Sequence, residues 1–256
     1  MSNDSEKWEW VDEDPIAKLL QTPAVSAAPV ASPAEGLMAA GRAHFEQLRF
    51  EEAARSFAAA LASEPDHPAA QFDLAVCLEK LGQWKPAAFS FRRTLEMDPG
   101  CVEALIGLGA CLLHLNRAEE ALVCFEQCGR AALLGKAVAL QQLSRYEEAD
   151  PIYRELLAAD PGAVEPLANL IALSVARQDV AAVEEYSRQL LRVHPQSKAA
   201  LQGLAILAIR NGDQATAIEY CSRLVEIDPD TFEGWFNLRF AQQRMTTGQQ
   251  SARSIA

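Results

Sequence analysis

The chain has 256 residues, 50% of them hydrophobic, and its 35 acidic side chains outnumber 23 basic ones, which gives a formal net charge of −12. A chain of this length can bury a large core, and its negative average charge opposes contact with nucleic acid or an anionic membrane surface. No stretch approaches the about 18 consecutive apolar residues of a membrane span, and the acidic N-terminus lacks the apolar segment of a secretory signal. We therefore expect a cytoplasmic protein with no membrane insertion and no nucleic-acid partner.

The six cysteines give no sign of a metal site or a disulfide framework. None belongs to a C-x-x-C pair, and four of them lie within apolar runs at helical spacing. Cys124 and Cys128 are one helical turn apart, but no histidine or second cysteine pair lies at the spacing of a zinc finger. We expect buried, reduced thiols, which fit a reducing compartment.

The first 33 residues differ in composition from the rest of the chain. Residues 4–20 mix acidic side chains with Trp8, Trp10 and several aliphatic residues, whereas residues 21–33 are rich in Ala, Pro, Ser and Val. The second piece is typical of a flexible linker. Two interpretations of the first piece stay open. Either residues 4–20 are disordered, or they form a linear motif that docks in a groove, of this chain or of another protein.

From Ala34 onward the sequence repeats with a fixed period. The small residue that opens the second helix of each expected hairpin recurs at intervals of 34, 34, 28, 34 and 34 residues. The prolines that follow these helices recur at intervals of 34, 62, 34 and 34, where the long interval spans one regular and one shortened unit. A fixed period of this length predicts a solenoid of helical units. The two series are Ala53, Ala87, Ala121, Ala149, Val183 and Ala217, and Pro65, Pro99, Pro161, Pro195 and Pro229.

Small and aromatic residues recur in the same register. The first helix of most units carries a small residue, at Gly41, Ala75, Gly109, Ala137 and Ala205, and the second helix carries an aromatic one, at Phe57, Phe91, Phe125 and Tyr153. A 34-residue helix–turn–helix unit with these positions resembles the tetratricopeptide repeat family. The resemblance implies an all-α, right-handed α-solenoid of about six hairpins with a C-terminal capping helix, and a role in binding other proteins.

The register also sets the expected boundaries and marks the irregular units. The third unit is six residues short, which predicts a tight or irregular junction near Gly129. The fifth has Ile171, Val183 and Ser187 where small, small and aromatic residues are usual, which predicts altered packing. In the capping helix we expect Trp235 and Leu238 to face the last hairpin. The expected parts are an N-terminal segment 1–33, a superhelix 34–244 with hairpins 34–67, 68–101, 102–129, 130–163, 164–197 and 198–231 and cap 232–244, and a disordered tail 245–256.

The resemblance places the first helices along a concave groove, so their outward residues are candidate ligands for a peptide. This lining is unusually apolar for an exposed surface. A partner protein would explain it, and so would burial within the superhelix or by self-association. The candidate groove residues are Met38, Arg42, Phe45, Phe72, Asp73, Val76, Ile106, Leu113, Leu134, Val138, Asn169, Ile206, Ile209, Phe236, Asn237 and Phe240.

Two binding modes known in the family leave different traces here. The clamp of Lys, Asn and Arg that grips chaperone C-termini is absent, because its matching positions hold Met38, Arg42, Asp73, Glu103 and Gly107. Asn169 and Asn237 resemble two rungs of an asparagine ladder that holds an extended peptide backbone, with Gly203 between them.

No catalytic grouping stands at a useful spacing. The four histidines are isolated, and no phosphate-binding loop, nucleophile elbow or H-E-x-x-H motif occurs. We expect a non-enzymatic scaffold or adaptor, without cofactor or metal, that binds an apolar or amphipathic peptide in its groove. Two alternatives stay open. One is a chaperone-like or autoinhibited module whose Trp-containing segment fills the groove in cis, and the other is a non-catalytic subunit of an enzyme complex.

Overall fold

The computed structural model describes the backbone of residues 33–255 and the side chains of residues 33–246. Thirteen α-helices and one 3-10 helix make up this part of the chain, in which no strand occurs. They divide into two compact units, one ending at Leu143 and the other beginning at Ser144. The boundary falls inside the predicted fourth hairpin, 130–163. The predicted motif at residues 4–20 lies outside the described residues.

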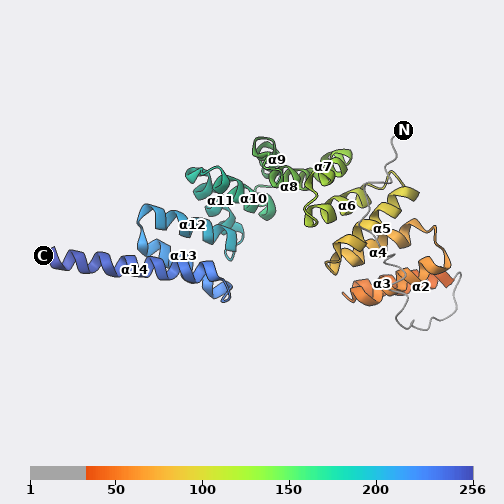
Figure 1. Cartoon of the computed structure of the whole chain (residues 1–256), viewed down its shortest axis with the longest axis horizontal. Coiled ribbons are helices and arrows are strands. Elements are labelled where there is room, and N and C mark those ends of the chain that lie inside the picture. The colour runs from red at the N-terminus through yellow and green to blue at the C-terminus, as the bar shows by residue number, and fades with distance from the viewer. Residues whose placement is uncertain (1–32, 256) are drawn as a thin grey trace. The chain divides into compact units, whose positions relative to one another are not determined.

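Unit 1 consists of helices that pack in chain order as antiparallel neighbours (Figure 1). The first helices α4 and α6, and also α6 and α8, touch one another directly. Each helix therefore contacts mainly its sequence neighbours, as the solenoid prediction requires. The elements are α2 (Pro33–Glu46), α3 (Phe50–Ser63), α4 (Pro68–Lys80), α5 (Trp84–Met97), α6 (Val102–His114), α7 (Ala118–Gln127), η2 (Gly129–Ala132) and α8 (Leu133–Gln142).

Unit 2 has the same construction. Its first helices α10, α12 and α14 touch in sequence, and α11 and α13 lie between them along the chain. Arg177, which follows α10, ties that helix to α9 through ion pairs with Glu147 at 2.7 Å and Asp150 at 3.3 Å. The elements are α9 (Tyr146–Ala159), α10 (Val164–Ala176), α11 (Val180–Val193), α12 (Lys198–Asn211), α13 (Gln214–Ile227) and α14 (Phe232–Ile255).

In each hairpin, one residue after the first helix has backbone angles in the left-handed region. These residues have φ between 58° and 73° and recur at the intervals of the sequence repeat, 34, 34, 28, 34 and 34. In five of these turns the next amide donates to the carbonyl five residues back, as from Gln83 to Leu78 at 2.9 Å, which is the Schellman arrangement. Non-glycine residues pay about 1–2 kcal/mol for this conformation. The six positions are Leu48, Gly82, Asn116, Ser144, Gln178 and Gly212.

Aromatic rings interlock with glycines where helices approach closely. A Cβ placed on Gly41 would lie 2.6 Å from the ring of Phe57, and one placed on Gly107 would lie 2.4 Å from that of Phe91. Phe125 lies between two such glycines, one in its own hairpin and one in the next helix. These rings are almost completely buried, so the small residues of the repeat are the sites that let the helices touch.

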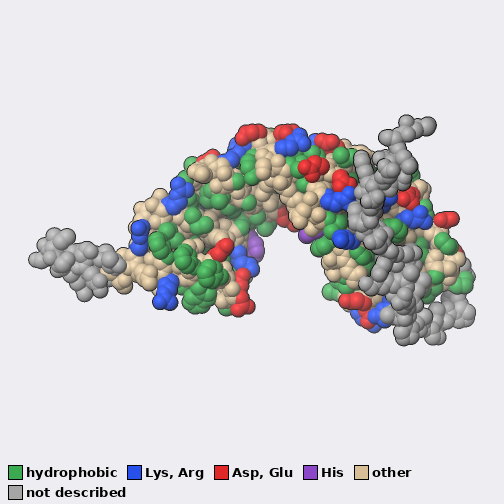
Figure 2. Space-filling model, in the orientation of Figure 1, with side chains coloured by type: hydrophobic (Ala, Val, Ile, Leu, Met, Phe, Trp, Pro, Cys, Tyr) green, Lys and Arg blue, Asp and Glu red, His purple; other side chains and the backbone are tan. Residues whose placement is uncertain are grey.

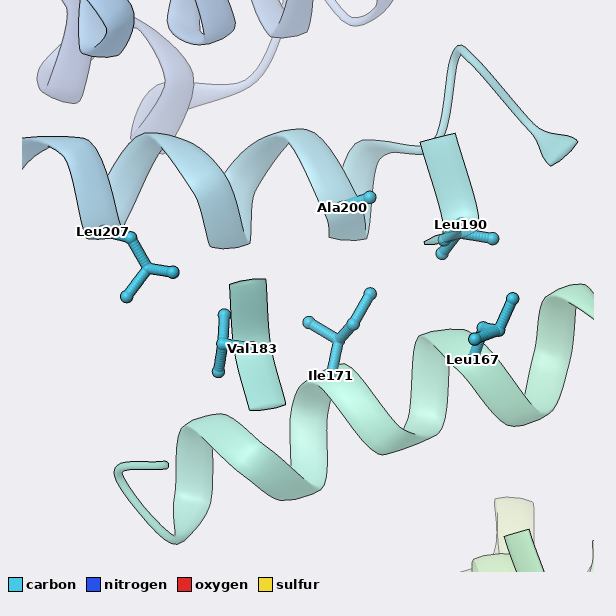
Figure 3. Packing of buried hydrophobic residues seen from close by; sticks show 6 residues of the cluster. All are labelled: Leu167, Ile171, Val183, Leu190, Ala200 and Leu207. Atoms are coloured by element: carbon cyan, nitrogen blue, oxygen red, sulfur yellow. The ribbon is translucent and has the colours of Figure 1, made fainter. Parts of the chain in front are cut away.

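The fifth hairpin keeps the same fold by exchanging large and small residues. Ile171 and Val183 replace the usual small residues, while Ser187 replaces the aromatic and is fully buried. The two branched side chains point into the space between α10, α11 and α12 (Figure 3), where they pack with Leu167, Leu190, Ala200 and Leu207. The predicted altered packing is therefore a redistribution of volume. Its one defect is the buried Ser187 hydroxyl, which has no hydrogen-bond partner.

The shortened third unit changes the backbone as well. Helix α7 has 10 residues where the other second helices have 14, and the 3-10 helix η2 links it to α8. Gly129 begins η2 with φ +59°, a conformation that favours glycine. The junction expected near Gly129 thus takes the form of one tight 3-10 turn in place of the missing helix end and Asp-Pro turn.

Helix α14 is longer than the sequence analysis expected. It continues to Ile255, whereas we placed its end at Arg244 and a disordered tail at 245–256. The expected boundary between the cap and the tail thus falls inside this helix. The sequence after Arg244 contains no proline, so nothing in the chain forces the helix to stop there.

Candidate functional site

In unit 1 the predicted peptide-binding residues are largely used for packing. Met38 on α2 is only 4% exposed. Phe45 packs edge-on against Phe50, with ring centroids 5.3 Å apart, and Phe72 packs in the same way against Phe91 at 5.8 Å. The remaining apolar candidates of this unit are half-buried: Val76 on α4, Ile106 and Leu113 on α6, and Leu134 and Val138 on α8.

The charged candidates of unit 1 bind each other. The Nε atom of Arg42 lies 3.5 Å from Oδ2 of Asp73, so the pair joins α2 to α4. Burial raises the pKa of the Asp73 carboxyl above its ordinary value, while the Arg42 charge acts in the opposite direction. The pair fastens two first helices together and leaves Asp73 as a half-buried carboxylate.

In unit 2 the predicted residues are far more exposed. Phe236 is 60% exposed, and Phe240 and Ile206 are each 37% exposed. Phe232, which the sequence analysis did not select, is 79% exposed and stacks on Phe236 at 6.2 Å. Ile209 differs, because it packs against the small core of Ala208, Ala217 and Ala241. We call the exposed set, Ile206, Phe232, Phe236 and Phe240, the Phe strip.

The helical period explains why the Phe strip faces outward. Phe232, Phe236 and Phe240 recur every four residues, which places them along one side of α14. The opposite side holds Gly234, Leu238 and Ala241, which are buried against the rest of unit 2. Figure 2 shows hydrophobic side chains gathered over the start of α14 and the helices beside it.

Trp235 does not face the last hairpin as we expected. Its side chain is 52% exposed, and its indole N–H donates to the carbonyl of Pro229 at 2.9 Å. In the inner hairpins of unit 2 the equivalent residues, Leu167 and Leu201, are fully buried. No second helix follows α14 to cover this position within the described residues. Leu238, in contrast, packs on Ala205, Cys221 and Val225, as expected.

Two half-buried amides lie beside the Phe strip. Asn169 on α10 and Asn237 on α14 occupy equivalent repeat positions, with Gly203 of α12 between them. Neither side chain makes a hydrogen bond within the part of the chain that the structure describes. Each amide can donate and accept, which is the chemistry that a peptide backbone requires.

Three arginines lie along the Phe strip in the sequence of its two helices. Arg244 lies over the ring of Phe240, with its guanidinium carbon 5.1 Å from the centroid. Arg210 on α12 and Arg239 on α14 are exposed and form no ion pair with any described residue. The one acidic residue of α14, Glu233, accepts a hydrogen bond from Gln202 at 2.6 Å. The strip is thus a row of apolar side chains with arginines beside it, on α12 and on the first part of α14.

Comparison with known proteins identifies the family. A family model described as a tetratricopeptide repeat matches residues 38–90, 80–125 and 180–231, which together cover more than half of the chain. The chain belongs to the tetratricopeptide repeat family. A second model, for the coatomer epsilon subunit, matches residues 120–202. This assignment confirms the fold predicted from the 34-residue period.

Individual relatives of this tetratricopeptide repeat protein are distant or partial. A segment of 81 residues, 31% of the chain, is 37% identical to the CTR9 homolog of Arabidopsis thaliana but spans only 7% of that protein. The structure is similar to that of PilW, a type IV pilus biogenesis factor, with TM-score 0.71 and 20% identity over 82% of this chain and 100% of that one. It is also similar to YrrB, a tetratricopeptide repeat protein with an unusual peptide-binding site, with TM-score 0.53 and 16% identity over 72% and 97% of the two chains.

The repeats bring no reactive groups together. Among the described residues, no three metal-ligating side chains of His, Cys, Asp or Glu cluster, and no helix is long and apolar enough to cross a membrane. All six cysteines are free. Burial raises the pKa of Cys77 and Cys111 to about 12, so these thiols stay protonated and unreactive at neutral pH. His114 stacks flat on the indole of Trp84 at 3.8 Å, which makes it a packing residue.

Proposed function

We propose that this tetratricopeptide repeat protein is a non-catalytic scaffold that binds an apolar or amphipathic peptide segment of another protein on its first helices. The docking surface is the Phe strip of unit 2, with Asn169 and Asn237 beside it. The observation that carries the proposal is the exposure of Phe236 and Phe240 on a helix whose other side is buried. Aromatic side chains grouped on a surface are the residues that most often dominate binding energy.

The strip combines the two kinds of contact that a peptide needs. The rings of Phe232, Phe236 and Phe240 offer apolar surface to bulky side chains, and burying one aromatic side chain covers about 150–250 Å². The free amides of Asn169 and Asn237 offer hydrogen bonds to the peptide backbone. The likeness to YrrB supports this proposal, because that protein of the same fold has a peptide-binding site.

The face of unit 1 has a smaller part in the proposal. Its aromatic candidates, Phe45 and Phe72, already contact rings of the neighbouring helices. Replacing Phe72 by a charged residue would therefore disturb the fold as well as any contact. The apolar candidates of α6 and α8 are half-buried, so unit 1 exposes less apolar surface than unit 2 does. We place the protein in the cytoplasm, because its free cysteines suit a reducing compartment.

A substitution in the centre of the strip tests this proposal. Phe236→Glu should reduce capture of the partner from a native extract by about thirtyfold, since losing one central aromatic anchor costs about 2 kcal/mol. The matched control is Val193→Glu, at a 48% exposed position of α11 outside the strip. Captured proteins are quantified by mass spectrometry, and circular dichroism checks that both variants keep their helices. Equal capture by the two variants would refute the proposed site.

A further inference from the structure

We propose that the Phe strip binds the Asp4–Leu20 segment of a second copy of this protein, so that two copies exchange segments reciprocally. This inference rests on the proposed function, because it names the occupant of the same surface. The segment itself lies outside the described residues, and only its sequence enters here.

The acceptor surface has the opposite charge to most of the protein. The chain as a whole carries −12, yet three arginines are exposed here, Arg210 near the C-terminal end of α12 and Arg239 and Arg244 in the first 13 residues of α14. Arg210 and Arg239 have no ion-pair partner among the described residues. A surface of this kind favours an acidic occupant with bulky apolar side chains, because both the charge and the rings would then be matched.

The chain contains one segment with this composition. Residues 4–20 hold six acidic residues and only two lysines, and all six acids fall between Asp4 and Asp14. Trp8, Trp10 and Val11 are interleaved with these acids. Indole rings are large apolar anchors with a polar N–H. Such a segment can place its rings on Phe236 and Phe240 and its carboxylates toward the arginines.

The chain order favours an exchange between two molecules. The segment joins the fold at α2, the first helix of unit 1, whereas the Phe strip lies on the last two first helices of unit 2. The contacts that hold the fold link helices that are neighbours along the chain. In a pair of molecules each copy supplies one segment and one strip. This reciprocal arrangement closes as a two-fold dimer.

The exposed area is sufficient for such a dimer. With about 200 Å² for each aromatic side chain, the exposed fractions of Phe232, Phe236 and Phe240, together with the neighbouring Trp235, leave about 450 Å² of aromatic surface per copy. Two copies therefore offer about 900 Å² before the segments are counted, and the segments bring the total above the lower limit of about 1,000 Å² for a specific protein interface.

A binding measurement tests the contact directly. A fluorescein-labelled peptide of residues 4–20 is titrated by anisotropy with the full chain carrying Trp8→Ala and Trp10→Ala, which disables the internal competitor. We expect saturable binding that weakens about thirtyfold with Phe236→Glu, a loss of about 2 kcal/mol. The double variant Arg239→Glu/Arg244→Glu should bind the peptide more weakly than the unmodified strip does, and this loss of affinity should grow as the salt concentration is lowered. Val193→Glu should leave the affinity for the peptide unchanged. Absence of binding to the unmodified strip would overturn the inference.

A mixing experiment separates exchange between copies from every other arrangement. Sedimentation equilibrium should show a dimer for the natural chain and monomers for W8A/W10A and for F236E. Mixing the two variants should restore dimers in part, because a mixed pair keeps one of its two contacts, the intact segment of F236E on the intact strip of W8A/W10A. A natural chain that is monomeric, a dimer that survives both variants, or a mixture that stays monomeric would each overturn the inference. If these assays fail while partner capture still depends on Phe236, the proposed function stands alone.

Discussion

Replacing Gly107 by alanine is expected to lower the free energy of unfolding by about 2 kcal/mol, although alanine is the better helix former by about 1 kcal/mol. The reason is the ring of Phe91, whose Cζ would lie 2.4 Å from the new Cβ. That ring cannot swing aside, because it is 1% exposed and packs edge-on against Phe72. Urea unfolding followed by circular dichroism measures the change.

The matched control for this prediction is Gly36→Ala. Gly36 also lies in a helix, α2, but a Cβ placed there meets no atom within 4 Å. The same substitution should therefore stabilise the protein by roughly 0.5–1 kcal/mol. Phe91→Leu should recover part of the loss in the Gly107→Ala background, because the smaller side chain leaves room for the methyl group. Equal effects of Gly36→Ala and Gly107→Ala would show that the interlock of ring and glycine is not real.

The second large effect is expected in the fifth hairpin, where three residues share one volume. Ser187→Phe alone should destabilise unit 2 by about 3 kcal/mol, because the new ring overlaps Ile171 and Val183. Ile171→Ala alone should cost about 2–4 kcal/mol through the cavity it leaves. The triple variant I171A/V183A/S187F recreates the arrangement of the third hairpin, where Phe125 lies between small residues. We expect its stability to return to within about 1 kcal/mol of the natural protein.

If the three residues exchange volume, the effects of the single substitutions on stability should not add in the triple variant. Ordinary damage to the core would give effects that add. Gly203 faces these side chains and stays unchanged in all of the variants. A Cβ placed on Gly203 would lie 2.9 Å from the Ser187 hydroxyl and 3.3 Å from Val183. The triple variant also removes the buried hydroxyl without a partner, which favours it by about 1–3 kcal/mol. Thermal unfolding of the single and triple variants provides the test. A triple variant that is less stable than each single one would contradict the proposed exchange of volume.

The period of the sequence was sufficient for the fold, but it left the turn chemistry and the domain division open. Glycine marked the left-handed turn residue at Gly82 and Gly212, whereas Leu48 and Gln178 adopt the same conformation without any signal in their residue type. Only the 34-residue register connects them. The division between residues 143 and 144 has no sequence marker, because it depends on how strongly neighbouring helices pack.

The candidate site was harder to predict, for a physical reason. Phe72 and Phe236 occupy equivalent positions, and the pattern alone assigns both to the binding face. The structure differs because Phe91, which is buried, covers one side of Phe72, while the ring that stacks on Phe236 is that of Phe232, which is itself 79% exposed. Trp235 is exposed because no second helix follows α14 among the described residues, and a period cannot show that a neighbour is missing. Phe232 could have been found from the regular four-residue spacing of Phe232, Phe236 and Phe240.

Amide hydrogen exchange is the most direct measurement of the central claim, that a partner peptide lies on the first helices of unit 2. The protein is compared alone and in complex with the partner captured through Phe236, and the exchange of each helix is read by mass spectrometry. Our account predicts slower exchange in α12 and α14 on binding, with α11 and α13 little changed. Protection confined to α11 and α13, or equal protection in the Phe236→Glu variant, would contradict it.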